Sequence, residues 1–290
     1  MPATASILRY PGGKSQLYNL VKQIIDDNAL NQRTYVEPFA GGAGLALKLL
    51  QKGVVSQVVI NDLDPAIYAI WDTCLNETER LIRFIKEVPF SVEEWDRQRA
   101  IYMNPENHSR VEIGLAAFYL NRTNKSGIIK GGIIGGREQN KTYTMSARFN
   151  RDTLSRKVTL IAEHKKDIVL LNYDAKTLIE QIDSILGQDV FLNIDPPYVQ
   201  KGAQLYRNFF NEQDHKDLYS TIAACKHPWI VTYDACDFVK ALYEGYTCRE
   251  IIVNYSASEK RSAEEYMFFS KELVRPKELG LQNKKDNKKD

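Results

Sequence analysis

The stretch Thr34-Tyr-Val-Glu-Pro-Phe-Ala-Gly-Gly-Ala-Gly44 decides the fold class. A short run of strand-forming residues enters a glycine-rich turn, and a helical pattern begins near Leu45. Glycines at such a turn let the backbone approach a ligand, and the first turn of a helix offers unpaired N–H groups. The stretch therefore predicts a strand-turn-helix unit of an open α/β sheet, with packing alone as the alternative reason for the glycines.

The same alternation of strands and helices extends along most of the chain. Apolar runs of strand length occupy residues 57–61, 168–171, 190–194 and 229–232, and helical spacing occurs over 67–75 and 178–186. Two last apolar runs, at 251–255 and 266–269, flank a polar stretch. The pattern predicts a Rossmann-like α/β fold, with a mostly parallel sheet and a C-terminal antiparallel hairpin.

Two segments interrupt the alternation and predict an inserted subdomain. Residues 75–120 have helical character, whereas residues 122–160 are glycine-rich, basic and poorly periodic. We therefore expect residues 1–74 and 166–275 to form the catalytic domain and residues 75–165 to form the inserted subdomain. The lysine-rich end, within 276–290, is expected to be a disordered tail.

Charge is concentrated in the insertion. The whole chain has a formal net charge of +2. The segment from Arg122 to Lys166 contains eleven Lys and Arg but only three Asp and Glu, so its own net charge is +8. Such a distribution suits a protein that grips a polyanion with one region, and a solvated surface is the alternative.

The cysteine pattern and the hydropathy argue against a disulfide-bonded protein, a zinc protein and a membrane-spanning protein. The four cysteines form no C-x-x-C pair and no zinc-like spacing with the histidines, so we expect reduced thiols, no metal site and a cytoplasmic location. No apolar run approaches the length of a membrane span, so we expect no contact with a membrane.

The motif Asn193-Ile-Asp-Pro-Pro-Tyr198 carries the chemistry. It follows an apolar strand, where open α/β sheets bind their ligands, and its two prolines remove N–H donors from the loop. A carboxylate, a proline carbonyl and an aromatic ring are thus held together. The Asp195 carboxylate and the Pro196 carbonyl can accept hydrogen bonds from an exocyclic amino group, while Tyr198 stacks on the extruded base.

Asp62 follows the second strand, about twenty residues after the glycine turn. A carboxylate at this point of an open sheet accepts hydrogen bonds from ribose hydroxyls. Together with the glycine turn, it predicts a nucleoside-containing ligand.

In its motifs and their order, the sequence resembles the Dam-like adenine-N6 DNA methyltransferases over residues 7–270. The motifs are Arg9-Tyr-Pro-Gly-Gly-Lys14, Val36-Glu-Pro-Phe-Ala-Gly-Gly-Ala-Gly44, Ile60-Asn-Asp-Leu-Asp64, Phe118-Tyr-Leu-Asn-Arg-Thr123 and Asp195-Pro-Pro-Tyr198. The resemblance implies S-adenosylmethionine as cofactor, S-adenosylhomocysteine as product and double-stranded DNA as substrate. It also implies a class I methyltransferase fold and no metal.

Residue roles follow from the resemblance position by position. Cofactor contacts are expected from Tyr10, Gly13, Lys14, Glu37, Phe39, Gly41, Gly44 and Asp62. Asp174 resembles the acidic residue that contacts the cofactor adenine, and it is also a candidate helix N-cap. Asp195, Pro196 and Tyr198 are the expected catalytic residues.

The DNA-recognition region departs from the family pattern. Members that read GATC carry an asparagine-glycine pair and an arginine here, whereas this chain has Lys125-Ser-Gly127 and Lys130. Lysine does not replace arginine in a bidentate contact with guanine, so GATC specificity is not transferred. The expected DNA-binding residues are Arg122, Asn124, Lys125, Lys130, Arg137, Lys141 and Arg148. Arg137, Gln139, Asn140 and Lys141 are candidates for base contacts, and Arg148, Arg151 and Arg156 for phosphate contacts.

The sequence leaves other activities and partners open. The Asp-Pro-Pro-Tyr chemistry also suits an RNA methyltransferase or a cytosine-N4 methyltransferase, and a non-catalytic DNA-binding regulator could keep the same fold. We expect a monomer, with two copies on one DNA as an alternative, and a restriction endonuclease of the same system as a candidate partner. Residues 199–211 are a candidate lid, and Tyr206, Phe209 and Phe210 either wall the base pocket or simply pack.

Overall fold

A computed structural model describes residues 4–10, 12–199, 210–255, 261–274 and 276. Within them the strands form one seven-stranded sheet in the order β3-β2-β1-β4-β5-β7-β6. The strands are β1 (Thr34–Glu37), β2 (Val58–Asn61), β3 (Ile168–Leu171), β4 (Val190–Ile194), β5 (Trp229–Asp234), β6 (Thr247–Tyr255) and β7 (Arg261–Phe269).

Strands β1 to β5 pair in parallel, and β7 runs antiparallel to both β5 and β6. This confirms the predicted mostly parallel sheet with a C-terminal antiparallel hairpin. From β1 the chain proceeds outward through β2 to β3, and it then returns to place β4 on the other side of β1. The order therefore reverses between β1 and β4, where open α/β sheets form their ligand-binding crevice.

Helices cover both faces of the sheet because successive strand residues point to opposite sides. Tyr35 packs in one core with α1 (Tyr18–Asp27) and α2 (Gly44–Gln51). Val36 packs in the other core, whose helices are α8 (Ala175–Glu180), α9 (Ile182–Leu186), α11 (Glu212–Ala224) and α12 (Asp237–Leu242). Residues 178–186, expected as one helix, form α8 and α9 because the chain leaves helical geometry at Gln181.

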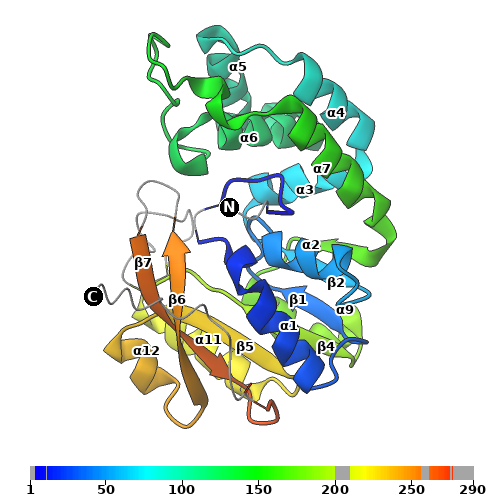
Figure 1. The fold of residues 1–290 in the computed structure, drawn as a ribbon, viewed down its shortest axis with the longest axis vertical. Coiled ribbons are helices and arrows are strands. Elements are labelled where there is room, and N and C mark those ends of the chain that lie inside the picture. The colour runs from blue at the N-terminus through cyan, green and yellow to red at the C-terminus, as the bar shows by residue number, and fades with distance from the viewer. Residues whose placement is uncertain (1–3, 11, 200–209, 256–260, 275, 277–290) are drawn as a thin grey trace, which may run out of the picture.

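The remaining helices gather at one end of the molecule, away from most of the sheet (Figure 1). They are α3 (Pro65–Asn76), α4 (Thr78–Glu87), α5 (Val92–Met103), α6 (Arg110–Thr123) and α7 (Arg151–Glu163). Helix α3 joins this group to the sheet by close packing against α6. A Cβ on Gly114 of α6 would lie 2.4 Å from the Ala69 carbonyl oxygen of α3, so glycine is required at this crossing.

Helix α7 corrects the expectation that residues 122–160 lack periodicity. Leu154, Val158 and Ile161 form one buried face of this helix, and Asn150 caps its N-terminus by accepting from the Thr153 N–H. The glycine-rich stretch before Asn150 obscures this spacing in the sequence.

Candidate active site

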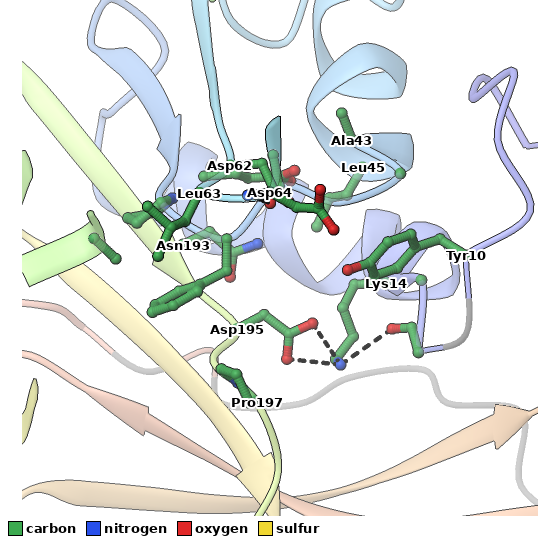
Figure 2. A pocket seen from close by; sticks show the side chains of 18 of the residues that line it. Tyr10, Lys14, Ala43, Leu45, Asp62, Leu63, Asp64, Asn193, Asp195 and Pro197 are labelled. Carbon is green, nitrogen blue, oxygen red and sulfur yellow. Dashed lines mark hydrogen bonds and ion pairs between the residues drawn. The ribbon is translucent and has the colours of Figure 1, made fainter. Parts of the chain in front are cut away.

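A pocket lies at the carboxyl ends of β1, β2 and β4, at the point where the strand order reverses (Figure 2). Most of the residues that the sequence predicted to contact a cofactor line it. They are Tyr10, Gly13, Lys14, Glu37, Phe39, Gly44, Asp62 and Asp174, and the predicted catalytic Asp195 lies on the same wall.

The glycine turn is fixed from both sides. Gly41 has a φ of +46°, and a Cβ there would lie 2.5 Å from the Tyr10 ring, so both its conformation and its space require glycine. The Trp71 indole N–H of α3 donates to the Gly41 carbonyl oxygen at 2.9 Å. Gly41 itself does not line the pocket, because the turn is packed beneath Tyr10, and Gly42 and Ala43 line it instead.

Asp62 belongs to the turn as well as to the pocket. Its carboxylate accepts from the Gly41 N–H at 2.8 Å and from the Asp64 N–H at 2.9 Å. Burial raises its pKa to about 6, although the two backbone donors favour the charged form. Asn61, directly before it, is buried and donates to the carbonyls of Pro38 and Tyr173, which ties the ends of three parallel strands together.

Glu37 ends β1 inside the pocket wall. One of its carboxyl oxygens lies 3.2 Å from the Tyr35 hydroxyl and accepts from the Ala46 N–H at 3.1 Å. The Tyr35 hydroxyl in turn accepts from the Asn193 amide at 2.7 Å. Burial raises the pKa of Glu37 to about 8, so this side chain is protonated at neutral pH in the free protein.

The structure confirms that Asp174 caps a helix, and its predicted contact with the cofactor adenine remains a prediction. It is the N-cap of α8, where it accepts from the N–H groups of Lys176 and Thr177, and it also lines the pocket. Phe210, the one described residue among the three candidate wall aromatics, lines the pocket and contacts Phe39 edge to face at 6.1 Å. Tyr206, Phe209 and most of the candidate lid lie outside the described residues.

Asp195 lies directly after β4 and is held by two donors. The Lys14 ammonium lies 2.8 Å from each of its carboxylate oxygens, and the Thr232 hydroxyl donates to it at 2.8 Å. Figure 2 shows Lys14 and Asp195 directed toward each other across the pocket floor. The N-terminal motif thus reaches the predicted catalytic Asp195 through Lys14, which the resemblance implied only as a cofactor neighbour.

Tyr198 and Glu265 complete this network behind Asp195. The Tyr198 hydroxyl accepts from Lys14 at 2.5 Å and donates to Glu265 at 2.7 Å, and a Glu265 oxygen lies 3.6 Å from the Lys14 ammonium. Sequence reasoning missed Glu265 because it lies on β7, far from every motif. Its 1% exposure shows that its carboxyl belongs to the interior.

The Pro-Pro-Tyr part of the motif is more enclosed than expected. Pro197 lines the pocket, whereas Pro196 and Tyr198 are buried beside it. The Lys14 ammonium lies 5.0 Å from the centre of the Tyr198 ring. Contact between a base and either Pro196 or Tyr198 remains a prediction.

Some of the predicted DNA-binding residues of the insertion are exposed to solvent, and others contact the rest of the protein. Lys125, Lys130, Lys141 and Arg148 are exposed. Arg137 is also exposed but pairs with Asp96 at 2.6 Å, and Arg122 is half-buried and donates to the Arg148 carbonyl.

Two other predicted residues of the insertion have structural contacts. Asn124 is fully buried, where its amide accepts from the Trp95 indole at 2.7 Å and donates to the carbonyls of Ile128 and Ile129. Arg151, a candidate for a phosphate contact, donates to the carbonyls of Ile85 and Val88.

Within the described residues, no group of three or more His, Cys, Asp or Glu side chains could hold a metal ion. No described helix is both long and apolar enough to cross a membrane.

Comparison with known proteins identifies the family. Residues 10–258 match the model of the D12 class N6 adenine-specific DNA methyltransferases. The chain belongs to this family. The match spans the glycine turn, the acidic pocket and Asp195, and it confirms the resemblance seen in the sequence motifs.

Two relatives of this D12 class protein carry the name type II methyltransferase. M.MjaIII of Methanocaldococcus jannaschii is 25% identical over 272 residues, which cover 84% of this chain and 90% of the relative. M.CviBI of Paramecium bursaria Chlorella virus NC1A is 22% identical over 261 residues, which cover 86% of this chain and 90% of the relative.

Proposed function

We propose that the protein transfers a methyl group from S-adenosylmethionine to the exocyclic amino nitrogen of an adenine flipped out of double-stranded DNA. The observation that carries this proposal is the position of Asp195, whose carboxylate lies on the wall of a pocket at the switch point of the sheet. Adenine-N6 methylation is the activity after which the D12 class is described.

The charges of the pocket suit a cationic cofactor. Five acidic side chains line it, and with Glu37 protonated the four aspartates still outnumber Lys14, its one Lys or Arg within the described residues. S-adenosylmethionine carries a sulfonium and an ammonium group, so an acidic pocket favours it over an anionic ligand. Asp62 and Asp174 would hold its nucleoside, and Glu37 would face its positive end. When bound, the cofactor supplies the methyl group and leaves as S-adenosylhomocysteine.

Asp195 acts on the amino group of the target base. A carboxylate has about four acceptor sites, and the contacts from Lys14 and Thr232 leave capacity for one more N–H. A hydrogen bond from the amino group to Asp195, with a second to the Pro196 carbonyl, draws its lone pair out of conjugation with the ring. The same carboxylate is placed to take the proton that the methylated nitrogen must lose.

The inserted helices would hold the DNA. Lys125, Lys130, Lys141 and Arg148 present exposed positive charge, and Arg137 can exchange its surface carboxylate for a base or a phosphate. Asn124 supports the loop of Lys125 and Lys130 from inside. Because both relatives are named type II methyltransferases, we include a restriction endonuclease of the same specificity as the partner system.

A methyl-transfer assay tests the proposal. Purified protein is incubated with labelled S-adenosylmethionine and, separately, with genomic DNA, total RNA and protein, and modified nucleosides are identified by mass spectrometry. The proposal predicts label in DNA as N6-methyladenine and none with Asp195→Ala. Label confined to RNA or to methylcytosine would overturn the substrate, and label that persists in Asp195→Ala would overturn the mechanism.

A further inference from the structure

Three arginines meet where the N-terminal segment crosses the inserted helices, and we call Arg9, Arg122 and Arg148 the arginine cluster. Arg122 of α6 donates to the Arg148 carbonyl, and Arg9 donates to the Asn124 carbonyl at 2.8 Å, just beyond the end of α6. Asn121 fixes the crossing, because its amide accepts from the Arg9 N–H and donates to the Arg9 carbonyl. The Arg9 and Arg122 guanidinium groups are therefore held near the end of α6, and the charge of Arg148 acts on both of them.

The cluster has no neutralising partner among the residues that the structure describes. Within the residues that the structure describes, no carboxylate forms an ion pair with any of the three arginines. Other arginines of the insertion do have such partners, as Arg97 has Glu94 and Arg137 has Asp96.

Burial makes this concentration of charge unfavourable in the free protein. Burial and the positive charges of Arg9 and Arg148 lower the pKa of Arg122. Its Nε–H is buried and has no hydrogen-bond partner in the described part of the chain. Burial and the charge of Arg122 also lower the pKa of the neighbouring Lys157, whose ammonium donates to the Ser6 carbonyl at 2.9 Å. A guanidinium stays protonated at neutral pH, so this repulsion persists until an anion binds.

We propose that the arginine cluster is a binding site for one phosphodiester group of the DNA backbone, next to the pocket that receives the target base. Guanidinium groups bind phosphate oxygens in bidentate fashion, which a single ammonium cannot do. The site opens to solvent at Arg148, which lies 5.4 Å from the ring of the half-exposed Tyr143. Arg9 directly precedes Tyr10, a wall of the pocket, so a phosphate held here fixes the strand beside the extruded nucleotide.

This inference rests on DNA being the substrate, and the salt dependence of DNA binding tests it. The affinity for a short fluorescent duplex is measured across a salt series for the wild type, Arg148→Gln and Arg148→Lys. Loss of one phosphate contact makes the slope of log K against log salt shallower by about 0.9. We expect this change in Arg148→Gln and the wild-type slope in Arg148→Lys, which keeps the charge. Lys52→Gln, at the opposite end of α2 from the pocket, is the control and should leave the slope unchanged.

Thermal unfolding of the free proteins separates binding from folding. Because Arg148→Gln removes one of three repelling charges and no side-chain hydrogen bond of the described residues, its Tm should equal or exceed that of the wild type. A wild-type slope in Arg148→Gln, or a lower Tm with the same slope, would overturn the proposal. Methyl transfer by the wild type is scored separately. An enzyme that methylates DNA with an unchanged Arg148→Gln slope refutes the site alone, and cluster-dependent DNA binding without methylation refutes the function alone.

Discussion

The pocket includes Tyr10 and the arginine cluster includes the preceding residue, Arg9, yet the two sites differ in how their charges are paired. In the pocket, the Lys14 ammonium contacts the carboxylates of both Asp195 and Glu265, so groups of opposite charge lie beside each other inside the protein. In the cluster, three arginines gather without a carboxylate among the described residues. A network of opposite charges holds its side chains in place before any ligand binds. A cluster of like charges gains its counter-charge only when an anion binds.

The difference separates two tasks. Chemistry requires groups that are already oriented, because reorganisation during the reaction raises its barrier. Binding to a polyanion requires positive charge that is not already paired, because the affinity comes from neutralising phosphates and releasing counterions. We therefore expect substitutions in the pocket to change turnover and substitutions in the cluster to change affinity and its salt dependence.

The largest effect is expected at Asp195. Asp195→Asn keeps the size of the side chain but replaces one carboxylate oxygen by an amide group that donates. It should lower kcat by about 10²–10⁴-fold, because general base assistance contributes a factor of this size. Single-turnover methyl transfer measures the loss, and calorimetry should show that S-adenosylmethionine binding is retained.

Asp189→Asn is the matched control, since Asp189 is an exposed residue directly before the opposite end of the same strand, β4. Equal losses of turnover in the two variants would mean that strand stability, and not the carboxylate at the pocket, explains the effect.

A substitution at Glu265 tests whether the second carboxylate beside Lys14 affects turnover. Glu265→Gln removes one of the two carboxylates that share Lys14, so the ammonium should be drawn more strongly to Asp195. We expect kcat to fall by roughly ten- to a hundredfold, as for a misplaced catalytic group, with little change in the KM for DNA. Glu264→Gln, an exposed neighbour on β7, should behave as the wild type. A raised KM with unchanged kcat would place Glu265 in DNA binding.

Glu37 gives a pH-dependent prediction for the free protein. Its pKa rises from 4.5 to about 8 in the folded state, so the folded chain holds a proton that the unfolded chain releases between these values. Stability from this group therefore falls as pH rises through this window. Glu37→Gln cannot lose that proton, so its Tm should exceed that of the wild type by several degrees at pH 8 and by less at pH 5. A Tm difference that is independent of pH would show that Glu37 titrates normally.

The smallest effect is expected at Arg137, the paired counterpart of the arginine cluster. Its exposed pair with Asp96 contributes little to stability, because solvent screens the attraction between two exposed charges. Arg137→Gln should leave Tm nearly unchanged and should reduce the salt slope of DNA binding less than Arg148→Gln does. A larger change in slope than in Arg148→Gln would reverse the ranking of the two sites.

Much of the fold was predictable because, in most elements, the spacing of apolar residues and the turn residues at the ends indicate the same secondary structure. The apolar runs at 34–37, 168–171 and 190–194 are strands as expected, and Gly44 begins a helix directly after the glycine turn. Helix α7 was missed because poorly periodic glycine-rich sequence precedes it. The break at Gln181 could not be read from spacing alone, since the apolar positions continue in register across it.

The site was predictable where motifs end strands and not where contacts cross the sheet. Glu37, Asp62 and Asp195 lie at the carboxyl ends of neighbouring parallel strands, so their convergence follows from topology. The contacts of Lys14 with Asp195, and of Glu265 with Tyr198, join residues 181 and 67 positions apart. Nothing in the local sequence of either acid indicates such a partner.

The most direct test of whether the pocket serves catalysis and the arginine cluster serves DNA binding measures both activities on the same proteins. Methyl transfer to DNA and the salt slope of duplex binding are determined for the wild type, Asp195→Asn and Arg148→Gln. We predict that Asp195→Asn binds DNA with the wild-type slope but forms N6-methyladenine at least about 10²-fold more slowly. Arg148→Gln should show a shallower slope and a raised KM while still transferring methyl groups. Loss of both properties in both variants, or a changed slope in Asp195→Asn alone, would contradict this division.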